Sequence, residues 1–119
     1  MIKCKLCETE TGSISLSIKG HAGAAETGKD IICASASILV YTAAQLVEGY
    51  GKSNMLNSKP ILIIKKGRAT VTCSPKKRYY DEVKHSFYVV QAGLSLLAYN
   101  YPQYITLEMF GKALDRRTP

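Results

Sequence analysis

Hydrophobic and polar residues alternate along two short stretches near the start of the chain, residues 2–7 and residues 13–18. A period of two predicts, in each stretch, a strand with one buried face. The intervening residues 9–12, Thr-Glu-Thr-Gly, are turn formers, so the two strands are expected to pair as an antiparallel hairpin. The second strand leads directly into a glycine-punctuated segment that begins at Gly20.

From Asp30 onward the hydrophobic period lengthens to three and four residues, which predicts an amphipathic helix that stops at Gly49 and Gly51. Its expected buried face consists of Ile32, Ala36, Leu39, Val40, Ala43, Leu46 and Val47. The small residues 34–37 are expected to allow close packing of this helix against the sheet.

A second hairpin is predicted over residues 60–73, because two apolar stretches flank the tight turn 65–68. A second amphipathic helix follows and is expected to end at Tyr101-Pro102, with its buried positions at Val83, Phe87, Val90, Leu94 and Leu97. His85 lies among polar residues near the start of this helix and is expected on the surface.

A last strand is predicted by Ile105, Leu107 and Met109, although the pattern does not say where it joins the sheet. The order of elements is then ββαββαβ. This order predicts a single α+β domain, with two helices packed on a mixed, mostly antiparallel sheet. The domain is expected to cover residues 1–110, and residues 111–119 are expected to form a basic C-terminal tail.

The composition sets limits on the class of protein. A chain of 119 residues is long enough for one domain with one hydrophobic core. No run of residues is expected to reach the ~20 apolar residues of a membrane span, and the alternating N-terminus lacks the apolar core of a signal peptide. We therefore expect a cytoplasmic protein without a membrane partner, in which Cys4, Cys7, Cys33 and Cys73 are free thiols.

A metal site is not predicted. Cys4 and Cys7 have the spacing of a zinc-binding pair, but the chain has no second closely spaced pair. In a strand, residues three apart also point to opposite faces. We expect no metal and no other cofactor.

The net charge of +7 and the isoelectric point near 9.3 favour acidic partners such as RNA or ribosome-associated material. Most of the cations are scattered along the sequence. Only Lys76, Lys77 and Arg78, together with Lys84, form a cluster. The chain has no Trp, and its aromatic residues do not interleave with basic ones, so stacking on bases is not predicted.

The residues whose side chains could take part in a reaction lie between Gly20 and Ser37. Asp30 is expected to be the N-cap of the first helix, which places Cys33 in the first turn, where the helix dipole favours a thiolate. Gly20, Gly23 and Gly28 would let the preceding loop fold back, so that His21 can approach Cys33. These are the parts of a thiol hydrolase. A cysteine in a helix is more usually a small buried apolar residue and a loop histidine is more usually solvated, so spacing alone does not assign Cys33 and His21 to catalysis.

Three further roles follow if the first helix begins at Asp30. The backbone N–H groups of Cys33 and Ala34 would be free to stabilise an oxyanion. Asp30 would cap the helix, orient His21, or do both. Ser37, one turn after Cys33, would hydrogen-bond near the thiol or the substrate, or else bond to the Cys33 carbonyl.

Two sequence motifs resemble the ribosomal-processing cysteine protease family (Prp, YsxB-like). The first is Gly-His-Ala-Gly at residues 20–23 with Gly-Lys-Asp-Ile-Ile-Cys-Ala-Ser-Ala-Ser at residues 28–37, and the second is residues 93–105. The resemblance implies that His21 and Cys33 are the catalytic pair, that Gly20 and Ala22 support them, and that Gly23 and Gly28 belong to a mobile loop. One departure is Ala24, where family members often carry an aromatic residue.

The resemblance also implies a function. Family members remove the N-terminal extension of a large-subunit ribosomal protein, and the resemblance implies that this protein is a homodimer. An indirect contact of the protein with the ribosome or RNA is also expected. Two alternatives stay open. One is a non-catalytic ribosome- or RNA-binding module with Cys33 in its core. The other is an interaction domain that dimerises through the aromatic residues of the second helix, although these are expected to cover the sheet edge instead: Phe87, Tyr88, Tyr99 and Tyr101.

Overall fold

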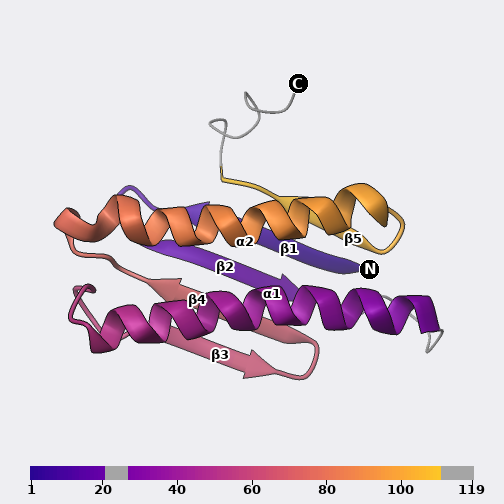
Figure 1. Cartoon of the computed structure of the whole chain (residues 1–119), viewed down its shortest axis with the longest axis horizontal. Helices are drawn as coiled ribbons and strands as arrows, with labels where there is room; N and C mark the ends of the chain where they lie inside the picture. Colours follow the sequence, from indigo (N-terminus) through magenta and orange to yellow (C-terminus); the bar gives the residue numbers. More distant parts are fainter. Residues whose placement is uncertain (21–26, 111–119) are drawn as a thin grey trace.

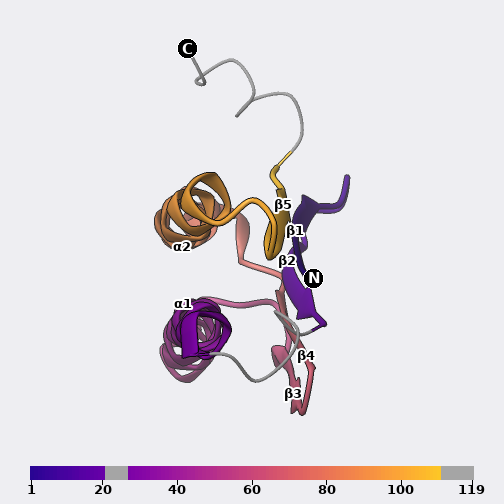
Figure 2. The same ribbon diagram turned by 90° about the vertical axis from the view of Figure 1, so that its right-hand side faces the viewer.

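The computed structural model describes residues 1–20 and 27–110, and the side chains of residues 27–30 are not included in that description. Within these ranges, two helices lie side by side on one face of a five-stranded sheet (Figures 1 and 2). The elements are β1 (Ile2–Glu8), β2 (Ile14–Lys19), α1 (Thr27–Lys52), β3 (Ile61–Lys65), β4 (Arg68–Cys73), a short 3₁₀ helix (Lys77–Tyr79), α2 (Tyr80–Asn100) and β5 (Ile105–Glu108). The predicted order ββαββαβ and the α+β class are confirmed.

The strand order is β3-β4-β2-β1-β5, and every pairing is antiparallel except that of β5 with β1. Both predicted hairpins are confirmed, as β1–β2 and β3–β4. The final strand takes the edge beside β1, and the backbone N–H of Ile2 donates to the carbonyl of Tyr104 at 2.8 Å just before the paired segment. The middle of the sheet is therefore assembled from strands distant in sequence, because β4 pairs with β2.

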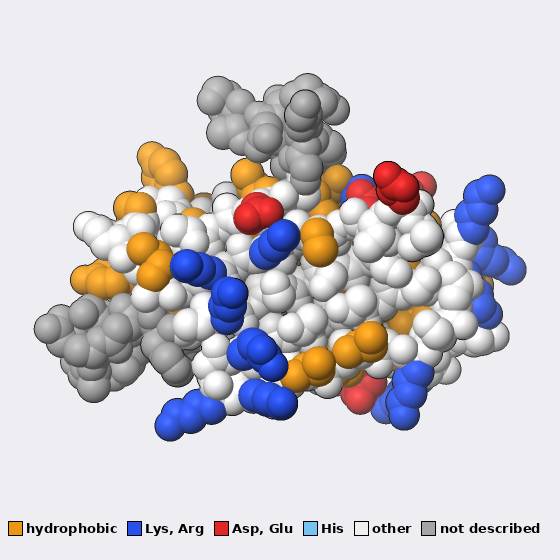
Figure 3. All heavy atoms as spheres, turned by 180° about the vertical axis from the view of Figure 1, so that it is seen from behind, with side chains coloured by type: hydrophobic (Ala, Val, Ile, Leu, Met, Phe, Trp, Pro, Cys, Tyr) orange, Lys and Arg blue, Asp and Glu red, His pale blue; other side chains and the backbone are white. Residues whose placement is uncertain are grey.

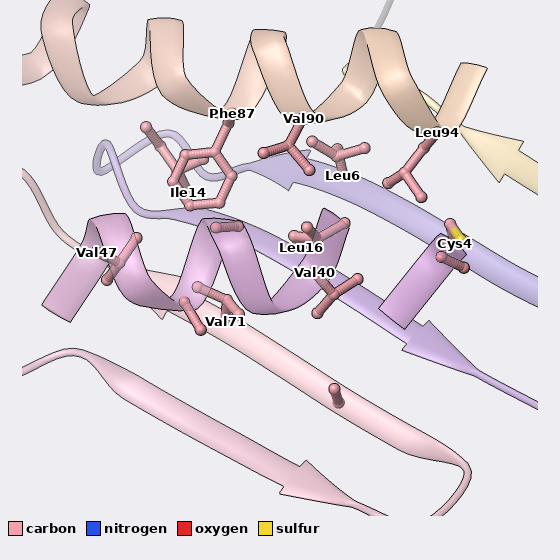
Figure 4. Packing of buried hydrophobic residues seen from close by; sticks show 14 of the residues in the cluster. Cys4, Leu6, Ile14, Leu16, Val40, Val47, Val71, Phe87, Val90 and Leu94 are labelled. Carbon is pink, nitrogen blue, oxygen red and sulfur yellow. The ribbon is translucent and has the colours of Figure 1, made fainter. Parts of the chain in front are cut away.

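The core lies between the sheet and the two helices (Figure 4). Alternate residues of the strands point toward the helices, as the period of two predicts. Phe87 of α2 is 1% exposed, and its ring lies beside Ile14 of β2. Cys4 is buried and Cys7 is exposed, so the two cysteines lie on opposite faces of β1 as expected. All four cysteines are free thiols.

Helix α1 is longer at both ends than the sequence predicts. It begins at Thr27, so Asp30 lies inside the helix and is not its N-cap. A capping preference is worth only about 1 kcal/mol, which an additional turn of backbone hydrogen bonds can outweigh. At the other end Gly49 and Gly51 are helical, and the helix ends after Lys52, with Asn54 in the left-handed region at φ 59°.

The buried face of α1 agrees with the prediction except at two positions. Leu46 is 39% exposed, so its assignment to the core is wrong, and Leu39 is only partly buried. Leu39 packs against α2 at Gly93, where an added Cβ would lie 2.7 Å from the Leu39 Cδ2 atom. The absence of a side chain at Gly93 therefore lets the two helices approach.

One part of α1, Ile31–Lys52, is long and apolar enough by length and composition to cross a membrane. The expectation that no stretch of the chain approaches such a length is wrong by these criteria. The core helix of a globular domain meets the same criteria of length and composition. Here 33% of the most apolar stretch of α1 is buried inside the structure. In this structure α1 covers the sheet with its apolar face.

The surface of α2 also departs from expectation. Lys84, assigned to the basic cluster, pairs with Glu8 of β1, with its Nζ atom 2.9 Å from one carboxylate oxygen and 3.0 Å from the other. Tyr99 is 83% exposed and does not cover the sheet edge. Tyr88 makes an edge-to-face contact with Phe110, with ring centroids 5.4 Å apart. His85 is exposed, as predicted.

Candidate active site

A cavity of about 290 Å³ opens at the end of the sheet where β2 finishes. Its walls come from the first half of α1, the ends of β1 and β2, and the β3–β4 hairpin at residues 64–69. On α1 the lining residues are Cys33, Ser37, Val40 and Tyr41. Cys33 is half-buried, so its side chain lies in the wall of a cavity that opens to solvent.

Gly20 lines the same cavity and fixes the direction of the chain as it leaves β2. Its φ of +98° lies in the left-handed region that glycine adopts without strain. A Cβ at this position would fall on the carbonyl oxygen of Met1. The Gly20 N–H also donates to the carbonyl of Gly67 in the β3–β4 turn, at 2.9 Å. Gly20 is therefore held between the N-terminus and the β3–β4 hairpin.

Cys33 and Ser37 line the cavity together, one helical turn apart. This confirms that the two residues share a face of α1, as their spacing predicts. Ala36 is buried beneath this face, whereas Ala34 is exposed on another side of the helix. The close packing expected of residues 34–37 is thus confined mainly to Ala36.

The start of α1 at Thr27 changes the predicted electrostatics of Cys33. The N–H groups without a partner inside the helix are those of its first four residues, 27–30. The N–H groups of Cys33 and Ala34 lie beyond them and are engaged in the helix, so the predicted oxyanion donors are not available in this conformation. The effect of the helix dipole falls off within the first turn, and Cys33 lies past it.

The other three cysteines lie in different surroundings. Burial raises the pKa of the Cys4 thiol to about 12 and that of the Cys73 thiol to about 11, because a thiolate is poorly solvated inside the core. Cys7 is exposed, on the sheet face that the helices do not cover. Among the four cysteines, Cys33 alone combines partial exposure with a place in the cavity.

Several predicted site residues lie outside the description. His21, Ala22, Gly23 and Ala24 fall in residues 21–26, and the side chain of Asp30 is not described. The described residues contain no group of three or more His, Cys, Asp or Glu side chains arranged to hold a metal ion. The proximity of His21 to Cys33 therefore stays a prediction.

The opposite wall of the cavity could not be predicted from the sequence. The hairpin at residues 64–69 reaches Cys33 only because β4 pairs with β2, which no local pattern indicates. Tyr41 was absent from the predicted site because it lies outside the motif. Its spacing is a usable signal, since it follows Ser37 by one helical turn on the face that carries Cys33.

Comparison with known proteins identifies the family and the fold. The family model described as cysteine protease Prp matches residues 1–106. Crystal structures with the same fold include SMU.848 from Streptococcus mutans, with 23% identity and a TM-score of 0.65 over 92% of this chain and 94% of that one. No curated protein matches the sequence significantly.

Two further crystal structures are of an essential ribosomal processing protease Prp from S. aureus. The complex with a substrate peptide has 19% identity and a TM-score of 0.67, and the complex with a covalently linked product peptide has 20% identity and a TM-score of 0.69. Each comparison covers 92% of this chain and 99% of that chain. These likenesses show the fold, and the family model matches most of the chain. The protein belongs to the Prp family of cysteine proteases.

Proposed function

We propose that this protease removes the N-terminal extension of a large-subunit ribosomal protein, with Cys33 as nucleophile and His21 as general base. The observation that carries the proposal is the cavity, which is lined both by Cys33 and by Gly20, the residue that precedes His21. Membership of the family and the ribosomal processing protease with the same fold support this choice of substrate.

In the proposed reaction, the Cys33 thiolate attacks the carbonyl carbon of the scissile peptide bond. His21 takes the thiol proton and then gives it to the leaving amine as the C–N bond breaks. The resulting thioester is hydrolysed by water. Asp30 is proposed to act electrostatically on His21 from within the helix, and Ser37 to contact the thiol or the substrate from the next turn.

The segment 20–30, whose last residues from Thr27 onward form the first turn of α1, is proposed to rearrange over bound substrate, with Gly23 and Gly28 lowering the steric cost of the movement. We further propose that residues 1–110 form the catalytic domain and that the enzyme works in the cytoplasm as a homodimer. The oligomeric state is measured by light scattering coupled to size-exclusion chromatography, and a monomer at the concentrations used for cleavage would contradict that part of the proposal.

The test is cleavage of an N-terminally extended ribosomal-protein peptide, read by product masses. Replacing Cys33 by Ala or His21 by Ala is expected to lower the rate by at least about a thousandfold, because neither partner substitutes for the other. The matched controls are Cys7→Ala, a thiol on the other face, and His85→Ala, an exposed histidine on α2. Substantial cleavage by either test variant, with the fold intact by circular dichroism, would refute the proposed pair.

A labelling experiment tests the thiol independently of the substrate. Iodoacetamide is expected to modify Cys33 and Cys7 in the folded protein and to leave Cys4 and Cys73 unmodified, because these two are buried and their thiol pKa is raised. A catalytic Cys33 is further expected to react faster than the exposed Cys7. Equal rates at the two sites would show that Cys33 is not activated.

A further inference from the structure

The face of the sheet opposite the helices carries a row of four cations, one on each of four neighbouring strands. The register places Lys65 opposite Arg68, Arg68 opposite Lys19, and Lys19 opposite Lys3. All four are exposed, and their strand neighbours Ile18, Ala69 and Cys4 point the other way, toward the core. Figure 3 looks onto this uncovered face and shows lysine and arginine side chains in a line across it.

Mutual repulsion of these four positive charges destabilises the folded state. Residues directly opposite each other on neighbouring strands lie about 5 Å apart, and like charges at that separation are destabilising. Within the described part of the chain, none of the four side chains forms an ion pair. The acidic residue Glu108, on the same face, belongs to the next row, where its carboxylate lies 3.6 Å from the Lys5 Nζ atom. The four positive charges are therefore left for a ligand to neutralise.

The surrounding side chains indicate the kind of ligand. The next row carries the hydroxyl groups of Ser17 and Thr70 between Lys5 and Ile63. Lysine, arginine, serine and threonine are the usual contacts to phosphate oxygens of nucleic acids. None of the five strands contains an aromatic residue on which a base can stack. This combination favours binding of the phosphate backbone of a nucleic acid, independently of its base sequence.

We propose that this cation row, Lys3, Lys19, Arg68 and Lys65, binds the phosphate backbone of RNA. The row ends at the β3–β4 hairpin, whose residues 64–69 line the cavity that contains Cys33. RNA bound along the row therefore passes beside the cavity, and a substrate protein held by that RNA is presented to the site. The interaction does not depend on the proposed chemistry of Cys33.

The test is fluorescence anisotropy of a labelled oligo-uridine with the full chain over a range of salt concentrations. Four phosphate contacts predict that log K falls with log[salt] with a slope of about −3. Lys19→Glu, at the centre of the row, is expected to weaken binding at least about fivefold at about 0.1 M salt, the effect of losing one contact. The matched control is Lys77→Glu, which makes the same charge change in the 3₁₀ helix, away from the row, and is expected to leave binding nearly unchanged.

Two further measurements make the result specific. Lys19→Glu is expected to raise the melting temperature, because it places a carboxylate between Lys3 and Arg68 and removes their repulsion. Cys33→Ala is expected to abolish cleavage but to keep RNA binding, so failure of the protease proposal and failure of this one are distinguishable. Equal weakening by Lys19→Glu and Lys77→Glu would overturn the proposal in favour of net charge. Binding of polyglutamate without binding of RNA would assign the row to an acidic polypeptide instead.

Discussion

Replacing Gly20 by Ala is expected to destabilise the protein and to impair the site together. At φ +98° an L-residue is strained by about 1–2 kcal/mol. The added Cβ would also fall on the Met1 carbonyl oxygen, which belongs to the backbone and cannot rotate away as a side chain does. Moving Met1 strains the neighbouring hydrogen bond from the Ile2 N–H to the Tyr104 carbonyl, worth about 1 kcal/mol.

Together these effects predict a loss of about 2–3 kcal/mol after allowance for the lower conformational entropy of Ala in the unfolded chain. For a chain of 119 residues this corresponds to a melting temperature lower by about 10 °C. The measurement is urea unfolding together with a thermal melt. Cleavage of the extended peptide is expected to fall as well, because Gly20 holds the chain immediately before His21.

The matched control is Gly49→Ala in α1. A Cβ at Gly49 meets no heavy atom within 4 Å, and Ala is favoured over Gly inside a helix by about 1 kcal/mol. This variant is expected to be more stable than the wild type and equally active. If Gly20→Ala unfolds within 0.5 kcal/mol of the wild type, as a tolerated surface substitution would, the close approach of Met1 to Gly20 is not a constraint and the reasoning fails.

Three other predictions concern the core and the surface. Burial raises the pKa of the Cys4 thiol to about 12, whereas the unfolded chain releases this proton near 9.0, so Cys4 should lower the free energy of unfolding by about 1.4 kcal/mol per pH unit between these values, in addition to the contribution of Cys73 up to its pKa of about 11. In urea titrations above pH 9.0, Cys4→Ala should remove the Cys4 contribution and leave that of Cys73, and a slope equal to that of the wild type would contradict the assignment. Phe87→Ala should cost about 3–5 kcal/mol in urea unfolding because it removes the largest fully buried side chain of the described core, whereas Val89→Ala, at a 59% exposed position, should be nearly neutral. Lys84→Met should cost about 1 kcal/mol through loss of the pairing with Glu8, and the difference should shrink in high salt; a salt-independent cost would point to packing instead.

The fold class and most element boundaries follow from the sequence because local periodicity reports which face of an element is buried. The alternation at Ile2, Cys4 and Leu6 and the helical spacing from Val83 to Leu94 each identify their buried positions correctly. The ends of α1 were misplaced because caps and glycines contribute only about 1 kcal/mol each, and such preferences yield to a continuous run of backbone hydrogen bonds.

Part of the candidate site can be predicted from the sequence, and part is seen only in the structure. The motif predicts Cys33 and Ser37 as site residues, and the structure places both in the wall of one cavity, as their spacing on the helix predicts. The sequence does not reveal that the β3–β4 hairpin forms the opposite wall, since that depends on the pairing of β4 with β2.

The sequence by itself determined the elements, their buried faces and the chemical character of the Gly20–Ser37 segment, since these depend on neighbours within a few residues. Only the tertiary structure decided the strand order, and with it the cavity at Cys33 and the alignment of Lys3, Lys19, Arg68 and Lys65 in one row. The physical reason is that strand pairing joins backbone groups irrespective of their distance along the chain. Residues scattered in sequence therefore become neighbours only when the register of the sheet is set.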